Sequence, residues 1–175
     1  MKGVGMFKVG EYIVHPGQGV CQVVEVGDGP SAAYKLLPVG RRHALEISFP
    51  VSGESRLRPV VSADDAKGLI DNYDNLATDD YKGRSTALEE EHFKDIMKHG
   101  SCRDSMCVVK TFRHRIAMVR AQNKKPPVAY ERILKEAQTR SLSELACALH
   151  STPEKVGELL REHDSEYVAE EHEDA

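Results

Sequence analysis

The stretch FKVGEYIVHPGQGV, residues 7–20, decides how the first third of this 175-residue chain folds. Its first half is rich in the β-branched and aromatic residues that favour strands. Pro16 fixes one backbone dihedral angle, and Gly17 and Gly19 permit positive φ angles, so residues 15–19 are typical of a tight turn. The stretch therefore predicts a strand, a turn and the start of a second strand.

The residues after this turn continue the pattern of short strands. In residues 20–26 every second residue shares a face, so Val20 and Val26 are expected on the same side of a half-buried strand. Further strands are predicted at residues 34–37 and 44–49. Four or five strands of this length, joined by short turns, predict a small β-barrel or a curled antiparallel sheet.

The remainder of the chain carries the start signals of helices. In such a signal a Ser or Thr precedes an acidic residue by three positions, because the hydroxyl oxygen accepts a hydrogen bond from an otherwise unpaired backbone N–H. Five segments fit: Ser62-x-x-Asp65, Thr86-x-x-Glu89, Ser101-x-x-Asp104, Ser141-x-x-Glu144 and Ser151-x-x-Glu154. The predicted fold class is therefore α+β, with an N-terminal β-barrel or curled antiparallel sheet followed by a C-terminal all-α bundle.

These patterns predict two domains, residues 1–61 and residues 62–175. Residues 72–83 are acidic and lack helical periodicity, so we expect a linker or loop between the units there. Residues 163–175 form an acidic end that is expected to fray. Residues 143–160 have the apolar rhythm of a helix-turn-helix, but the acidic residues of the second segment would repel phosphate. We interpret this segment as a helix pair of the bundle core, with DNA reading as the alternative.

The formal net charge of -4 conceals one strongly basic segment. Residues 101–140 contain ten Lys and Arg against three Asp and Glu, a local charge of +7. The cations on the predicted helix and its exit are Arg103, Lys110, Arg113, Arg115, Arg120, Lys124 and Lys125. Most recur at helical spacing and form one stripe beside an apolar stripe.

Two interpretations of this basic stripe remain open. It could follow a DNA backbone, since each cation that neutralises a phosphate releases a counterion. It could equally be a solvated helix face whose cations favour the helix dipole near its C-terminal end. No accompanying pattern of Arg, Asn and Gln indicates base recognition, so any DNA binding is expected to be weak and independent of sequence.

No arrangement of residues indicates catalysis or a bound cofactor. The chain lacks a phosphate-binding loop, a nucleophile elbow and a dinucleotide fingerprint, so we expect neither an enzyme nor a small-molecule substrate. The carboxylates of residues 89–91 are interpreted as a solvated first turn of a helix. The four cysteines and eight histidines lack zinc-ligand spacing, and no metal is expected. The chain also lacks a long apolar run, so the prediction is a cytoplasmic protein without a membrane partner.

The motif FKVGEYIVHPGQGV of residues 7–20 resembles the opening of the CarD family, which usually reads F-x-x-G-D-x-V-x-Y-P-x-x-G-V. His15 stands where the family usually has Tyr. The segments LEISFP, residues 45–50, and LRPVVS, residues 57–62, resemble the later strand of that family and its entry into the first helix. The Tudor-like modules of transcription-repair coupling factors share the first motif.

The resemblance implies a Tudor-like β-domain that binds the β subunit of RNA polymerase, followed by a helical domain near upstream promoter DNA. Members of the family stabilise the open promoter complex, act without catalysis and are bacterial. By this resemblance, residues 44–49 would pair with an edge strand of the polymerase. Ile47, Ser48 and Phe49 are the candidate polymerase-binding residues, and polymerase binding would associate the protein with the nucleoid.

Two departures from the family pattern affect this expectation. Ser48 stands where better-known members have an arginine, so a charge-assisted contact is missing. The chain contains no Trp, whereas the family places one near the start of its second helix as a minor-groove wedge. DNA contact would then depend on the basic stripe. The alternative function is a Tudor-like adaptor that binds another protein or RNA without promoter DNA.

Overall fold

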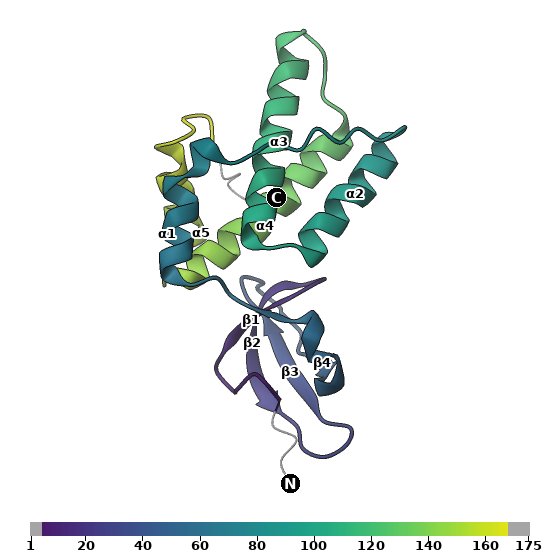
Figure 1. Cartoon of the computed structure of the whole chain (residues 1–175), viewed down its shortest axis with the longest axis vertical. Coiled ribbons are helices and arrows are strands. Elements are labelled where there is room, and N and C mark those ends of the chain that lie inside the picture. Colours follow the sequence, from purple (N-terminus) through teal and green to yellow (C-terminus); the bar gives the residue numbers. More distant parts are fainter. Residues whose placement is uncertain (1–4, 168–175) are drawn as a thin grey trace. The chain divides into compact units, whose positions relative to one another are not determined.

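The computed structural model describes residues 5–167, and the chain divides into two compact units, Met1–Val61 and Ser62–Ala175. Among the described residues, the strands lie in the first unit and the α-helices lie in the second (Figure 1). This order confirms the predicted α+β class.

The first unit is one antiparallel sheet with the strand order β4-β3-β2-β1-β5. Its elements are β1 (Tyr12–His15), β2 (Gly19–Val26), β3 (Ala33–Pro38), β4 (Ile47–Pro50), the 3-10 helix η1 (Val51–Arg56) and β5 (Arg58–Pro59). The predicted turn joins β1 to β2, and its Gly19 has a φ of 75°. The His15 Nδ1 atom accepts hydrogen bonds from the backbone N–H groups of Gly17 (3.0 Å) and Gln18 (3.1 Å), which fixes the turn.

The core of this unit lies on one face of the sheet. It consists of Phe7, Ile13, Cys21, Val23, Tyr34, Leu36, Phe49 and Leu57. A bulge between Val23 and Glu25 shifts the register of β2 against β3. Val26 consequently packs against this core, whereas strict alternation groups it with Val20, which lies outside the cluster. The expected shared face of Val20 and Val26 is therefore wrong, because the extra residue of a bulge reverses the alternation beyond it.

The second unit consists of helices, four of which begin at a Ser or Thr cap. Its elements are α1 (Ala63–Asp71), the 3-10 helix η2 (Tyr73–Asn75), α2 (Thr86–His99), α3 (Cys102–Ala121), α4 (Val128–Ala148) and α5 (Pro153–Arg161). In contrast, α4 begins after Pro127 without a side-chain cap. Ser62 caps α1 and Ser101 caps α3, as predicted. Ser101 and Asp104 form a complete capping box, in which each side chain accepts a hydrogen bond from the backbone N–H of the other.

The other predicted helix starts differ from the structure. The N-caps of α2 and α5 are Ser85 and Thr152, each one residue from the predicted position. Ser141 lies inside α4, where its hydroxyl donates to the carbonyl oxygen of Ala137, so no helix begins there. A serine inside a helix can satisfy its hydroxyl on the preceding turn, and the start motif alone does not distinguish the two situations.

The central helix of the bundle is α4, which contacts α1, α2, α3 and α5. Phe112 of α3 packs edge to face on Phe93 of α2, with ring centroids 4.7 Å apart, and on Tyr130 of α4 at 5.2 Å. The end of α4 and α5 form a helix pair in which Val156 and Leu160 are buried. This pair corresponds to the interpretation of residues 143–160 as part of the bundle core.

Two segments without strands or α-helices differ from expectation. Residues 72–83 connect α1 to α2 inside the second unit, so the predicted linker between the units is wrong. The sequence predicts fraying from residue 163, but His163 and Asp164 are partly buried and Tyr167 is almost fully buried. The rest of that predicted acidic end, residues 168–175, lies outside the described residues.

The described part of the chain, residues 5–167, contains no helix long and apolar enough to cross a membrane. Within the same residues, no group of three or more His, Cys, Asp or Glu side chains is placed to hold a metal ion.

The displaced cap of α5 gives a matched pair of substitutions. The Thr152 hydroxyl oxygen accepts from the backbone N–H of Lys155 at 3.3 Å, so Thr152→Ala should lower the free energy of unfolding by about 1 kcal/mol. Ser151→Ala should change it by less than about 0.5 kcal/mol, because Ser151 is exposed and does not cap the helix. Urea denaturation of both variants measures the difference. The reverse order would show that the sequence-predicted cap is the real one.

Candidate functional site

One candidate site is the open edge of the sheet at β4. The strand pairs with β3 on one side, and no strand of the described residues pairs with its other side. The backbone N–H of Val51 donates to the carbonyl oxygen of Ala32 at 2.9 Å, and Tyr34 lies opposite Phe49. Because backbone groups of an antiparallel strand point alternately to either side, the N–H and C=O of Ser48 point to the open edge.

The side chains of β4 divide between the core and the surface. Phe49 is 6% exposed and belongs to the core, where the ring of His15 lies edge to face at 5.3 Å and the Arg56 guanidinium lies 5.0 Å from its centroid. Ile47 also packs against the core, and only Ser48 and Pro50 are exposed. Of the three predicted polymerase-binding residues, Ser48 is exposed, Ile47 is partly buried and Phe49 is buried. Ile47 and Phe49 instead hold the strand on the sheet.

Contacts within the second unit engage three of the seven predicted cations, Lys110, Arg113 and Arg115. Lys110 Nζ donates to the carbonyl oxygens of Tyr73 (3.3 Å), Asp74 (2.6 Å) and Leu76 (2.8 Å). These carbonyls belong to η2 and the residue after it, a segment with few backbone hydrogen bonds of its own. Lys110 thus acts as a cap for this turn.

Arg113 anchors the segment that follows α5. Its Nε and Nη2 atoms donate to the two carboxylate oxygens of Asp164 at 2.6 and 2.9 Å. The guanidinium lies 5.4 Å from the ring centroid of Tyr167, and that ring packs edge to face on Tyr73. Burial raises the pKa of Asp164, but the Arg113 hydrogen bonds outweigh it, so the pKa lies below its ordinary value. We call Arg113, Asp164 and Tyr167 the C-terminal latch.

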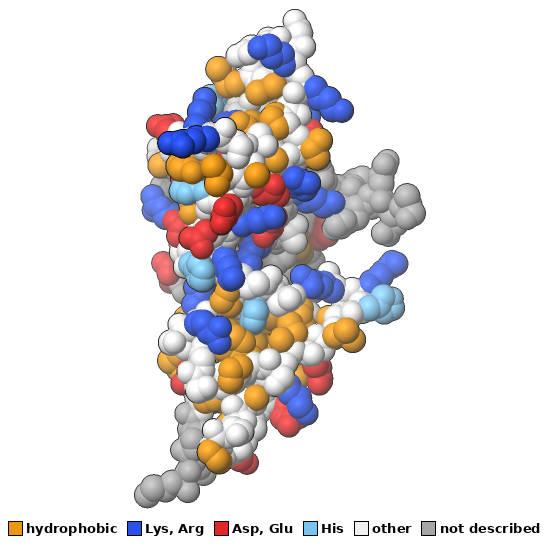
Figure 2. Space-filling view, turned by 90° about the vertical axis from the view of Figure 1, so that its right-hand side faces the viewer, with side chains coloured by type: hydrophobic (Ala, Val, Ile, Leu, Met, Phe, Trp, Pro, Cys, Tyr) orange, Lys and Arg blue, Asp and Glu red, His pale blue; other side chains and the backbone are white. Residues whose placement is uncertain are grey.

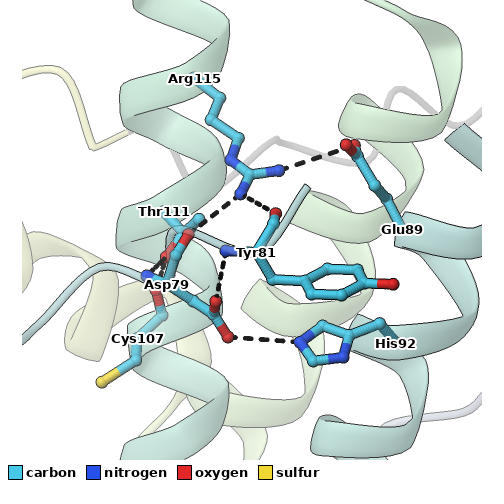
Figure 3. A network of polar contacts seen from close by, with 7 residues as sticks. All are labelled: Asp79, Tyr81, Glu89, His92, Cys107, Thr111 and Arg115. Atoms are coloured by element: carbon cyan, nitrogen blue, oxygen red, sulfur yellow. Dashed lines mark hydrogen bonds and ion pairs between the residues drawn. The ribbon is translucent and has the colours of Figure 1, made fainter. Parts of the chain in front are cut away.

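Arg115 holds the loop between η2 and α2 (Figure 3). Its Nη2 atom donates to the carbonyl oxygens of Asp79 (3.0 Å) and Tyr81 (2.5 Å), and its Nη1 atom lies 3.6 Å from the Glu89 carboxylate. Both charged side chains are nearly buried. The His92 ring stacks on Tyr81 at 3.8 Å and lies 3.4 Å from an Asp79 oxygen, which completes the network.

The solvated turn that the sequence predicts for residues 89–91 is therefore wrong for Glu89 and Glu90, and of the three only Glu91 is exposed. Glu89 is buried against Arg115, and Glu90 forms ion pairs with Lys94 at 3.1 Å and Arg132 at 3.0 Å. Helical spacing reveals Lys94, which lies four residues after Glu90, but not Arg115 and Arg132, which come from α3 and α4.

The remaining cations of the predicted DNA-binding set are exposed. They are Arg103, Arg120, Lys124 and Lys125. Among residues 5–167, Arg120 is the one of these four that forms an ion pair, with Glu131 at 3.6 Å. Both of these side chains are at least half exposed, so the pair is weak. Lys and Arg side chains lie beside hydrophobic ones at the upper end of Figure 2, the end at which α3 ends in Figure 1. The structure thus gathers three of the seven predicted cations at this end of α3.

The C-terminal latch predicts a pH-dependent contribution to stability. Asp164→Asn should lower the free energy of unfolding at pH 7 by about 2 kcal/mol, because the partly buried Arg113 loses a charge-assisted pair. The folded pKa of Asp164 is depressed, so this contribution is complete above the unfolded pKa of about 3.9 and is lost as the pH falls through the folded value. The gap between wild type and variant should therefore close below about pH 4.

Urea denaturation from pH 7 down to pH 2.5 measures this gap. The matched control is Asp95→Asn, which removes an exposed carboxylate paired with His99 and should change stability by less than about 0.5 kcal/mol. A gap for Asp164→Asn that stays constant down to pH 2.5 would show that the carboxylate charge is not responsible.

Comparison with known proteins bears on the first unit. Residues 7–65 match the family model of the CarD-like/TRCF RID domain, which covers the sheet and the first residues of α1. A search of curated proteins gives no match to the chain. The matched domain is an RNA polymerase-interacting one, which supports a CarD-like RNA polymerase-binding factor. The resemblance noted in the sequence is thereby confirmed: the match of residues 7–65 to the CarD-like/TRCF RID domain is consistent with a CarD-like protein.

Proposed function

We propose that this chain is a non-catalytic bacterial transcription regulator that binds the β subunit of RNA polymerase and stabilises the promoter open complex. The observation that carries the proposal is the open edge of β4, which lies in a domain of an RNA polymerase-interacting family. Polymerase binding would also associate the protein with the nucleoid.

The edge of β4 suits the addition of a strand from a partner. An unpaired edge offers backbone donors and acceptors that bind an extended segment without requiring a particular side chain. In β4 the outward N–H belongs to Ser48, because Pro50, the next outward residue, has no N–H. The core contacts of Ile47 and Phe49 hold this edge in place before the partner arrives, which reduces the entropy lost on binding.

The helical unit would contact DNA through the exposed end of α3. Lys110, Arg113 and Arg115 are engaged within the unit, so the exposed Arg120, Lys124 and Lys125 are the cations available to phosphates. Three phosphate contacts support weak binding that decreases steeply with salt and does not depend on base sequence. Arg103 is exposed as well and would add to this field from the start of α3.

Replacement of Ser48 by proline tests the polymerase contact. Ser48→Pro removes the outward N–H, and an edge strand tolerates proline where the N–H faces solvent. We expect the affinity for RNA polymerase to fall at least about tenfold, and the open complex to lose its added lifetime. A pull-down with polymerase from the encoding bacterium and an open-complex lifetime assay measure the two effects.

The control is Ser48→Ala, which keeps the backbone N–H and should bind nearly as well as wild type. Unchanged binding by Ser48→Pro, with an unchanged melting temperature, would exclude pairing at β4. If wild type itself does not bind polymerase, the chain is better described as an adaptor that uses its sheet for another protein or for RNA.

Charge reversal at the end of α3 tests the DNA contact. The triple variant Arg120→Glu, Lys124→Glu and Lys125→Glu should lose at least about tenfold in affinity for duplex DNA at 50 mM salt, and its salt dependence should flatten. Fluorescence anisotropy with a labelled 20-base-pair duplex measures both. The triple variant Lys67→Glu, Lys98→Glu and Lys155→Glu changes the net charge equally at other exposed positions of the same unit. Equal losses in the two triple variants would assign binding to net charge alone.

A further inference from the structure

The loop between β3 and β4 is a feature that the proposed edge contact does not use. Residues 39–46 connect the two strands, and all of them except Ala44 are exposed. Gly40 has a φ of 79°, a left-handed conformation that turns the chain after β3. The loop leads directly into the open edge, because Ile47 is the first residue of β4.

The loop concentrates positive charge that lacks internal partners. Arg41, Arg42 and His43 follow one another, and neither arginine forms an ion pair within the described residues 5–167. This contrasts with Lys35 on the neighbouring strand, which is paired with Glu25. The carboxylate of the loop itself, Glu46, offsets only one of the two arginine charges. The entry to β4 is therefore electropositive.

The loop also exposes an apolar side chain. Leu45 is 82% exposed, the highest value among the exposed large hydrophobic residues of the described chain. It shares the strand parity of Ile47 and Phe49, but it precedes the paired part of β4 and does not reach their core. Single exposed leucines are common on protein surfaces. Leu45 is of interest because it lies between two arginines and the unpaired edge of β4.

We propose that residues 41–45 form a second part of the strand-docking site, which selects an extended protein segment with an apolar residue and carboxylates at the end that meets the start of β4. The inference rests on the proposed function, in which that segment belongs to the polymerase β subunit. Ser48, the one non-proline residue of β4 with an exposed side chain, is uncharged, so the paired strand by itself does not discriminate between partners. The loop supplies discrimination, with Arg41 and Arg42 for charge and Leu45 for an apolar contact.

A nucleic acid is the other polyanion that two adjacent arginines could bind. The observations favour a protein segment, because an extended polypeptide can pair with both the backbone donor and the backbone acceptor of Ser48, whereas a phosphate can only accept. An apolar side chain as exposed as Leu45 likewise suits the surface of a protein partner better than a row of phosphates.

The test uses the full chain and RNA polymerase core enzyme from the encoding bacterium, immobilised for kinetic measurements at 50, 150 and 500 mM KCl. The double variant Arg41→Glu and Arg42→Glu should reduce the association rate about tenfold at 50 mM KCl. The reduction should shrink at 500 mM KCl, because salt screens exposed charges. Leu45→Ser should instead raise the dissociation rate severalfold at all three salt concentrations. The double variant Lys98→Glu and Lys155→Glu, with the same change in net charge, should bind like wild type.

The outcomes separate this inference from the proposed function. Loss of binding by wild type would overturn both. Wild-type binding with unchanged kinetics in the loop variants would overturn the loop inference and leave the proposed function intact. A second arm measures affinity for a 20-base-pair duplex. If the arginine variant loses DNA affinity and keeps polymerase kinetics, the loop is a nucleic-acid contact and the inference fails. Circular dichroism and melting temperatures should match wild type in all variants, because the substituted residues are exposed.

Discussion

Three cationic side chains of α3 fix the irregular segments of the helical unit, and the arrangement of that unit depends on them. Lys110 caps η2, Arg113 holds the segment after α5, and Arg115 holds the loop before α2. Each contact joins residues more than 30 positions apart in sequence. Since these segments have few backbone hydrogen bonds of their own, the charge-assisted bonds provide the order that a helix or strand would otherwise supply.

The two candidate surfaces differ in which of their groups are used for packing and which remain exposed. In the sheet unit, the apolar side chains of β4 are used for packing and its backbone is left open. In the helical unit, three of the seven predicted cations, Lys110, Arg113 and Arg115, are used for internal contacts. Of the four exposed ones, three lie at the end of α3. A surface is available to a partner only where folding has not already used its groups. The open edge of β4 and the end of α3 meet this condition.

The sequence predicts those parts of the fold that depend on neighbours along the chain. The turn at Gly17 and Gly19 and the caps at Ser62 and Ser101 are local, so their motifs suffice. The shift at Val26 and the interior position of Ser141 are not local. A bulge depends on the facing strand, and a helix continues through a serine when the packing of both halves outweighs the alternative cap.

The candidate sites also combine features that are local in sequence with features that depend on distant residues. The predicted strand at residues 44–49 is right for residues 47–49, whereas residues 44–46 belong to the loop before β4. The strand order that makes β4 an edge is a property of the whole sheet, so the sequence of this segment does not reveal it. Helical spacing correctly aligns Lys110, Arg113 and Arg120, yet the groups that occupy the first two come from distant segments. The local charge of +7 therefore overstates the positive charge that residues 101–140 can offer to DNA, because internal contacts occupy part of it. The exposed end of α3 retains three of the available cations.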